Sequence, residues 1–402
     1  MRIALTDEHE QLRTELRTYF GELVTPEVRA GLAAATGANL DESSGEFGDA
    51  NVYKDVIRRI GHDGWLGIGW PTEYGGQNRS MIEQLIFMDE ASLASAPVPF
   101  LTTNTVGPTL MHFGSEEQRK ELLPKIIGGE LHFSIGYSEP EAGTDLASLT
   151  TRAVRDGEEY VINGQKMWTS LIQYADYVWL ACRTDPEAPK HKGISMILVP
   201  TDVPGFSWTP VRTVSGVTTS ATFYQDVRVP VKNLVGEENK GWNLITNQLN
   251  HERVALCSAA NVQHLVNDIR HWAHETELAD GRRVIDQEWV QVHLARVHAK
   301  TEFLKLINWK IAWGVKKGVG MQDASATKVF GTELYCEAYR LLMEVLGEES
   351  VVRGGSPGSL LKSRVERMYR SALILTFGGG TNEVQRDIIS MVGLGMPRAP
   401  RF

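Results

Sequence analysis

Cysteine is scarce in this sequence. The three cysteines among 402 residues, Cys182, Cys257 and Cys336, lie far apart, and no C-x-x-C pair occurs. We therefore expect neither a disulfide framework nor a metal site. A reducing compartment fits this cysteine content best, so the expected location is cytoplasmic.

Long hydrophobic runs and an excess of positive charge are also missing. No stretch of about eighteen apolar residues occurs, and the amphipathic N-terminus lacks the apolar core of a signal peptide, so we expect no membrane partner. The 41 basic residues against 50 acidic ones give a net charge of −9. We expect no nucleic-acid partner, because binding a phosphate backbone requires a basic surface.

Several catalytic motifs are absent. The sequence has no G-x-G-x-x-G after a predicted strand, no P-loop and no H-E-x-x-H, which excludes nucleotide binding by a Rossmann or P-loop device. One G-x-S-x-G run spans Gly354 to Gly358, but it lies among Gly, Ser and Pro between two helical patterns. It lacks the preceding buried strand of a hydrolase nucleophile, so we interpret it as a loop.

The patterns that are present predict three domains and an α+β fold. Helical spacing of apolar residues dominates residues 1–130, with a loop expected over 36–50. Short β-branched and aromatic runs dominate 131–237, which favours an antiparallel β-barrel or sandwich over a parallel sheet. Helical periodicity returns over 238–402, in segments 241–276, 286–316 and 322–347, and predicts a four-helix bundle.

One carboxylate interrupts an apolar stripe of the first bundle helix. Ile245, Leu249, Glu252 and Leu256 follow the spacing of one helical face, so Glu252 stands at an inward position. Burial without a local cation would raise its pKa toward the range of a general base. An ion pair with a distant Lys or Arg across the bundle is the alternative that the spacing leaves open.

Two turns offer small and hydroxyl side chains after predicted strands. The run Ser138–Asp145, SEPEAGTD, follows the strand 131–137, and Asn163–Ser170, NGQKMWTS, follows another. Glycine and hydroxyl residues allow a flat ligand to approach the backbone, and a tryptophan ring can lie against it. Taken alone, the first is also an ordinary turn, and the tryptophan an ordinary core residue.

Together these stretches resemble the acyl-CoA dehydrogenase family over nearly the whole chain. The resemblance is carried, in order, by GWPTEYGG (69–76), FGSEEQRKELLPKIIGGE (113–130), YSEPEAGTDLAS (137–148), VINGQKMWTS (161–170), DVRVPVKNLVGEENKGW (226–242) and GGGTNEVQRDI (378–388). It implies an N-terminal helical domain, a β domain and a C-terminal four-helix bundle. It also implies FAD as cofactor and oxidation of an acyl-CoA thioester to the 2-enoyl-CoA.

The resemblance assigns roles to individual residues. In such enzymes a carboxylate removes the α-proton while the β-hydride passes to flavin N5. Substrate contacts would come from Asn250, Arg253 and Ser148. Cofactor contacts would come from Ile135, Tyr137, Ser138, Gly143, Thr144, Trp168, Ser170, Thr381 and Glu383.

The sequence departs from the commonest family pattern at the base. Many members carry the base as the Glu of a Tyr-Glu-Gly-Thr run near the C-terminus, but the matching run here is Gly378–Thr381, and Gly379 occupies the position. A minority place the base on the bundle helix immediately before a substrate-contacting Arg, as in Glu252–Arg253. The resemblance and the helical stripe thus both assign the base to Glu252.

A second departure concerns the neighbouring subunit. Members commonly donate Arg and Gln side chains to the FAD of a partner, whereas the corresponding residues here include carboxylates, which would repel a pyrophosphate. These positions are Glu277, Asp280, Gly281, Glu288, Glu344, Gly347 and Glu348. We therefore expect a second, homologous subunit in an α2β2 assembly; a homo-oligomer with displaced flavin contacts is the alternative.

The function expected from these observations is FAD-dependent acyl-CoA dehydrogenation. The arrangement resembles actinobacterial enzymes that shorten steroid side chains, so a bulky or steroid CoA ester is the preferred substrate, with an electron-transferring flavoprotein as electron acceptor. Two alternatives remain: a same-fold flavin oxidase or monooxygenase, and a non-catalytic partner subunit.

Overall fold

The computed structural model describes most of the chain. Its described ranges are 4–35, 50–216, 218–255, 257–314, 320–354 and 356–398, with side chains placed in them except at 33–35, 50, 249–255 and 362. The loop expected over 36–50 lies outside these ranges except for its last residue, Ala50, which begins a helix.

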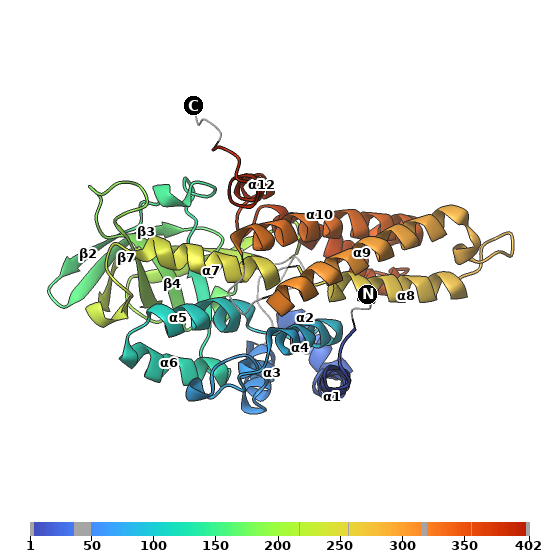
Figure 1. The fold of residues 1–402 in the computed structure, drawn as a ribbon, viewed down its shortest axis with the longest axis horizontal. Coiled ribbons are helices and arrows are strands. Elements are labelled where there is room, and N and C mark those ends of the chain that lie inside the picture. Colours follow the sequence, from blue (N-terminus) through green and yellow to red (C-terminus); the bar gives the residue numbers. More distant parts are fainter. Residues whose placement is uncertain are drawn as a thin grey trace.

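Helices form the N-terminal part of the chain, below the β-sheet and the bundle in Figure 1. Thr6, Ser80 and Ser115 begin three of them, because each side-chain oxygen accepts a backbone N–H three residues later. Buried residues of α1, α3 and α4, such as Phe20, Ile57 and Phe87, share one core. The helices are α1 (Asp7–Leu23), α2 (Pro26–Ala35), α3 (Ala50–His62), α4 (Met81–Ala94), α5 (Gly107–Phe113) and α6 (Glu116–Ile127), with a π-helical turn at Leu101–Val106 before α5.

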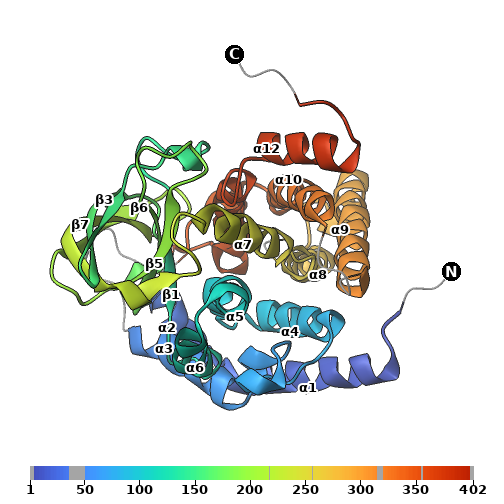
Figure 2. The same cartoon turned by 60° about the vertical axis from the view of Figure 1, so that its left-hand side comes forward.

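A curled sheet follows, at the left of Figure 2. Its strands are β1 (Phe133–Gly136), β2 (Arg152–Asp156), β3 (Glu159–Lys166), β4 (Tyr177–Arg183), β5 (Ile194–Pro200), β6 (Phe206–Arg212), β7 (Thr218–Pro230) and β8 (Leu234–Val235). They lie in the order β6-β7-β3-β2-β4-β5-β8, with β1 beside β4. Most pairs are antiparallel, as predicted, but β1 and β2 each pair with β4 in parallel, which the prediction did not include.

The central strands β4 and β5 separate two hydrophobic cores. Val178, Leu180 and Cys182 face the interior of the curled sheet. Trp179 and Ala181, between them, pack with residues of α5, α6 and α7. Successive side chains of one strand point to opposite faces of the sheet. Because both faces of β4 and β5 are buried, nearly every residue of these strands is apolar. This packing fixes the sheet against α5 and α7, which lie beside it in Figure 2.

The bundle contains the long C-terminal helices. They are α7 (Gly241–Ala255), α8 (Ala260–Glu275), α9 (Glu288–Gly314) and α10 (Met321–Leu346), followed by α11 (Arg364–Ala372) and α12 (Asn382–Ile388). The helical segment expected over 241–276 was wrong at one point, because the helix stops after Ala255 and resumes at Ala260. Residues between these ends are bonded to side chains of other helices, an arrangement that local spacing does not reveal.

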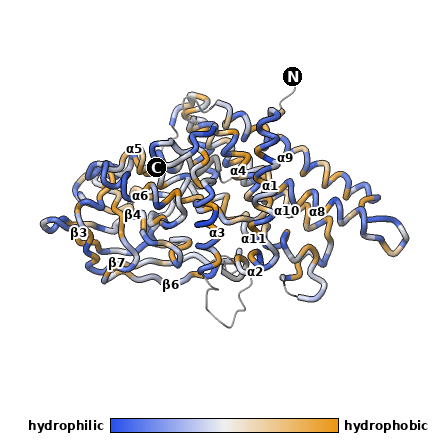
Figure 3. The backbone as a smooth tube through the Cα atoms, turned by 90° about the horizontal axis from the view of Figure 1, so that it is seen from below, coloured by the Kyte–Doolittle hydropathy of each residue, from blue (hydrophilic) through white to orange (hydrophobic). Residues whose placement is uncertain are grey.

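Hydrophobic and hydrophilic residues alternate along the bundle helices in Figure 3. Among the described residues, no helix combines the length and the apolar character that a membrane crossing needs.

Candidate active site

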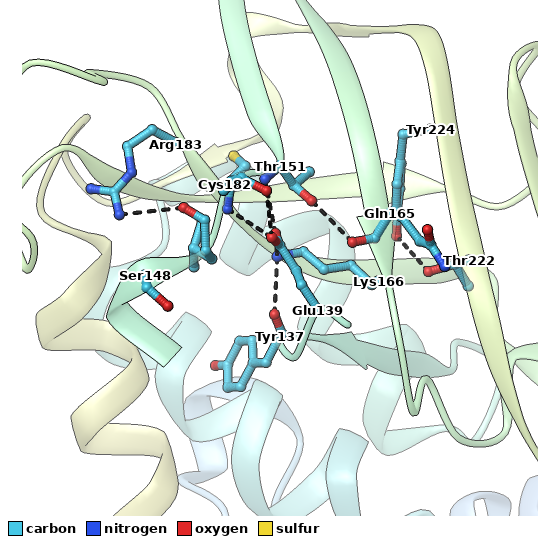
Figure 4. Close-up of polar contacts among 12 residues, drawn as sticks. Tyr137, Glu139, Ser148, Thr151, Gln165, Lys166, Cys182, Arg183, Thr222 and Tyr224 are labelled. Carbon is cyan, nitrogen blue, oxygen red and sulfur yellow. Dashed lines mark hydrogen bonds and ion pairs between the residues drawn. The ribbon is translucent and has the colours of Figure 1, made fainter. Parts of the chain in front are cut away.

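A buried ion pair lies beneath the SEPEAGTD turn. The Lys166 side chain is fully buried at the end of β3, and its Nζ donates to Glu139 Oε1 at 2.8 Å and to the Tyr137 carbonyl at 3.0 Å. Glu139 also accepts the backbone N–H groups of Thr150 and Thr151, at 2.7 and 2.8 Å. Figure 4 shows this network between the strands. The beginning of the turn is thereby fastened to the end of β3 and to the residues just before β2.

The charge state of Glu139 follows from these contacts. Burial acts to raise its pKa, but the Lys166 ammonium and the hydrogen bonds from Thr150 and Thr151 outweigh burial and lower the pKa to about 2. The carboxylate is therefore ionised at neutral pH. A buried charge with this many donors makes the turn rigid.

A backbone bond brings the two predicted ligand-binding turns together. The Met167 N–H donates to the Ser138 carbonyl at 2.8 Å. This bond places Ser138 next to Met167, and so close to the segment that starts at Trp168, although the two residues lie in separate motifs. Two of the predicted cofactor residues are thus neighbours.

Trp168 is the most unusual residue of this segment. Its side chain is 54% exposed, and its φ is +69°, a left-handed conformation that bulky residues rarely adopt. The alternative that Trp168 is a core residue is wrong. Strained backbone with an exposed aromatic ring is typical of a ligand-binding position.

Ser134 and Ser170 connect the first strand to the same segment. The Ser134 hydroxyl donates to the Ser170 carbonyl at 2.9 Å, and the Ser170 hydroxyl lies 3.0 Å from Thr219 Oγ1. Ile135, the next residue of β1, is partly buried and pairs in register with Trp179. The predicted residues Ile135, Ser138, Trp168 and Ser170 therefore lie in neighbouring segments, where the end of β1 meets the chain that follows β3.

The Tyr137 side chain points away from that group. Its hydroxyl is bonded to Gln248 Oε1 of α7 and accepts the Trp179 Nε1–H at 3.2 Å. Gln248, fully buried, donates to Thr105 Oγ1 at 3.3 Å. Because these partners occupy the Tyr137 hydroxyl, its predicted cofactor contact falls to the backbone. The network joins the sheet, the π-helical turn and α7.

The predicted base and two substrate residues lie one turn further along α7. The backbone of Asn250, Glu252 and Arg253 is helical, and their side chains lie outside the described part of the structure. Residues four apart share a helix face. Position 252 is therefore on the face of α7 that carries Gln248, the face turned toward Tyr137 and the π-helical turn.

The remaining predicted residues divide between two loops. Gly143 and Thr144 are exposed in the SEPEAGTD turn, and the Ser148 hydroxyl donates to the Asp145 carbonyl at 2.7 Å. Thr381 begins α12 by accepting the Val384 N–H at 3.3 Å, while Glu383 is exposed on that helix.

A buried lysine holds the segment before α12. Lys328 Nζ donates to the carbonyls of Thr376 and Gly380, at 3.1 and 2.7 Å, and to Asn382 Oδ1 at 2.8 Å. Gly379, which replaces the common base, has a φ of +68°. A glutamate there would adopt a strained conformation, so this backbone suits glycine.

The carboxylates expected to repel a partner's flavin are exposed, and two of them are paired within the chain. Asp280 accepts bonds from Arg282, which lowers its pKa, and Glu344 bonds His293 and Arg340 at 2.8 and 2.9 Å. The guanidinium groups of Arg282 and Arg340 reduce the repulsion inferred from sequence. Donated Arg or Gln contacts are still missing at these positions.

A surface cavity of about 580 Å³ lies away from these residues. His112 and Ser115 line it from one side, and Lys240 and Asn243 from the start of α7 line it from the other. None of the predicted site residues contributes to it. Among the described residues, no cluster of His, Cys, Asp and Glu could hold a metal ion.

Sequence reasoning did not assign Glu139, Lys166, Gln248 or Lys328. Glu139 and Lys166 lie in motifs already identified from the sequence. The signal for Lys166 was a charged residue within a strand whose pattern predicts burial. Gln248 lies one turn before Glu252 and could have been found from the same helical stripe. Lys328 gave no local signal, because its acceptors come from residues 48 to 54 positions later.

Comparison with known proteins agrees with the geometry. Acyl-CoA dehydrogenase N-terminal, middle and C-terminal domains match residues 6–130, 134–227 and 239–394. Acyl-CoA dehydrogenase FadE26 of Mycobacterium tuberculosis is 63% identical over 408 residues, 100% of both chains. A chain of the ChsE4-ChsE5 complex from Mycobacterium tuberculosis has a TM-score of 0.91 and 62% identity, over 99% of this chain and 100% of that one. A chain of the Tcur3481-Tcur3483 steroid ACAD has a TM-score of 0.90 and 49% identity, over 99% and 100%. The chain belongs to the acyl-CoA dehydrogenase family.

Proposed function

We propose that this chain is the catalytic subunit of a heteromeric, FAD-dependent acyl-CoA dehydrogenase, with Glu252 as the base. The position of Gln248 carries the proposal. This side chain is fully buried and bonded to Tyr137 of the SEPEAGTD motif. A carboxylate one turn later on the same face of α7 would therefore lie near Tyr137, which is joined through the backbone of its own motif to the other predicted residues.

The described residues fit FAD at the place where the end of β1 meets the segment after β3. Trp168 offers an exposed ring, and Ser138 and Ser170 offer hydroxyls beside it. Gly143 has open space among the described residues where a Cβ would stand. FAD, when bound, supplies the acceptor of the substrate's β-hydride. We assign Ile135, Ser138, Gly143, Thr144, Trp168, Ser170, the Tyr137 backbone and, from the bundle, Thr381 and Glu383 to its binding.

The chain's own contribution to the reaction is removal of a proton. The Glu252 carboxylate takes the α-proton of the thioester as the β-hydride leaves, so a double bond forms between Cα and Cβ, and the enzyme holds the proton. Arg253 and Asn250, adjacent on the helix, and Ser148 would orient the CoA thioester.

A bulky substrate is favoured by similarity to the steroid ACAD named above. We assign to this chain a CoA ester of a steroid side chain, with an electron-transferring flavoprotein as acceptor of the electrons and the cytoplasm as location. These assignments are more specific than the general acyl-CoA oxidation of the family.

Assembly with a second, homologous subunit is supported by two observations. One relative is a complex of two differently named chains. Helix α9, at the right of Figure 2, also exposes several large apolar side chains. These are Trp289, Val292, Phe303, Leu306 and Trp313, between 43% and 71% exposed. Groups of exposed large apolar side chains are typical of protein interfaces, and we propose an α2β2 arrangement with one FAD per αβ pair.

Anaerobic reduction of the bound flavin tests the function. The chain is co-expressed with the related subunit, and flavin absorbance is followed after adding a steroid side-chain CoA ester or a straight-chain ester. We expect rapid bleaching with the first. Glu252→Gln should abolish bleaching, whereas the control Glu275→Gln, at an exposed position of α8, should not. Unchanged bleaching in Glu252→Gln would instead identify the chain as a non-catalytic partner.

The isolated chain provides the test of assembly. We expect it to bind little FAD and to turn over slowly without its partner. Stoichiometric FAD and full turnover in a homotetramer would contradict the heteromer.

A further inference from the structure

The break between α7 and α8 is bonded to three other helices. The Cys257 carbonyl accepts the Asn308 Nδ2–H of α9 at 3.1 Å. The Ser258 carbonyl accepts the Tyr335 hydroxyl of α10. These bonds occupy backbone carbonyls that a continuous helix would use internally, so helical bonding is interrupted at Cys257 and Ser258.

The third helix belongs to the N-terminal part of the chain. The Ser258 hydroxyl donates to Asp89 Oδ1 of α4 at 2.6 Å, and its oxygen accepts the Ala260 N–H at 3.1 Å. Burial raises the pKa of Asp89 to about 6, against the effect of the Ser258 bond. The Ser258 hydroxyl is thus the hydrogen-bond donor that acts against the effect of burial on this carboxyl group.

Close packing leaves the break little freedom to move. A Cβ on Gly331 of α10 would lie 2.6 Å from Cys257 Cβ and 2.8 Å from its Sγ. Cys257 is fully buried in the bundle core. The helix end is therefore fixed on one side by α10 and on the other by Asp89.

We infer that Asp89 and Ser258 are positioning residues for the base Glu252, an inference that rests on the proposed function. Position 252 lies one turn before the end of α7, and Ser258 lies three residues beyond that end. A helix moves as a rigid element, so a shift at its last turn displaces the side chain that the turn carries. Displacement of a reacting group by about 1 Å can cost about 100-fold in rate. The N-terminal domain thus contributes to catalysis through one hydrogen bond.

The test measures α-proton removal separately from hydride transfer. The assembled, flavin-loaded complex is mixed in D2O with tert-butylacetyl-CoA, whose Cβ carries no hydrogen, and deuterium entering Cα is followed by mass spectrometry. The variants are Ser258→Ala, Asp89→Ala and Asp89→Asn, because an asparagine oxygen still accepts the serine proton. Thr301→Val is the control, since its buried hydroxyl donates only to Val297 of its own helix.

We expect Ser258→Ala and Asp89→Ala each to slow exchange about 10-fold and to lower kcat without raising KM. The double variant should be no slower than either single one, because both remove the same bond. Asp89→Asn should retain the wild-type rate. Amide hydrogen exchange of the peptide covering 250–260 should quicken in the two alanine variants alone.

The inference would be overturned if Ser258→Ala exchanged the α-proton at the wild-type rate and lost only as much thermal stability as Thr301→Val. The Ser258–Asp89 contact would then be purely structural. Failure of the proposed function has a separate signature. In that case Glu252→Gln itself would exchange at the wild-type rate.

Discussion

Buried charge at single positions carries much of the site's rigidity. Lys166 and Glu139 are both almost fully buried, and their pairing fastens the turn that presents Ser138. Removing one partner of such a pair leaves an uncompensated charge, which is more costly than removing both. The pair therefore makes stability at this turn depend on two individual side chains.

Lys166→Met should lower the free energy of unfolding by about 3 to 5 kcal/mol, because it strands the Glu139 carboxylate. Urea denaturation followed by circular dichroism measures the loss. Lys120→Met is the matched control, since Lys120 forms an exposed pair with Glu116, and its effect should stay below about 1 kcal/mol. Equal effects of the two substitutions would show that burial of the Lys166 pair is unimportant.

The same pair predicts how stability depends on pH. The pKa of Glu139 is lowered from 4.5 to about 2 in the folded chain, so its ionised form stabilises the fold above pH 4.5. This contribution is lost as the pH falls from 4.5 toward 2. Thermal denaturation across this range should show a steeper loss of stability in the wild type than in Glu139→Gln. Parallel curves would contradict the assigned pKa.

Among the elements, α10 organises the C-terminal segment. Lys328 reaches three acceptors in residues 376–382, the segment that includes Thr381 and leads into α12. Fixing this segment would hold the proposed flavin contacts of Thr381 and Glu383 in place beside Gly379. Its geometry depends on a lysine far away in the chain.

Lys328→Met should loosen this segment, because it removes three hydrogen bonds to one ammonium. Hydrogen exchange should show faster labelling of amides in 376–382 than in the wild type. Arg340→Met, on the same helix at an exposed position bonded to Glu344, should leave that labelling unchanged. If both variants labelled alike, Lys328 would have no special role there.

The sequence was sufficient for the type and order of the elements but not for their junctions. Apolar spacing predicted the α+β fold class and the helices near α9 and α10, because those patterns are local. The domain boundaries at 130 and 237 stay predictions. The break between α7 and α8 could not be predicted, since its partners Asp89, Asn308 and Tyr335 lie 51 to 169 residues away. The exposure of Trp168 likewise depends on tertiary contacts of the turn.

The proposed assembly would use surfaces that this chain leaves exposed. Helix α9 presents large apolar residues, and acidic residues occupy the positions that would donate flavin contacts to a neighbour. Both features are explained by a partner subunit that covers the first and supplies the second. Homology to a two-chain complex points the same way.

Phe303→Asp combined with Trp313→Asp should disrupt the assembly, because two carboxylates would be buried at the interface without partners. Light scattering of the co-purified complex should report a smaller species. Val154→Asp, at an exposed apolar position of β2, should leave the mass unchanged. An intact complex in the double variant would place the interface elsewhere.

Exchange of the substrate's α-proton in the Glu252→Gln complex decides whether this residue is the base. With tert-butylacetyl-CoA in D2O, the wild-type complex should label Cα, and Glu252→Gln should be slower by about 100-fold or more, the usual contribution of a general base. Exchange at the wild-type rate would assign proton removal to another group and contradict the mechanism.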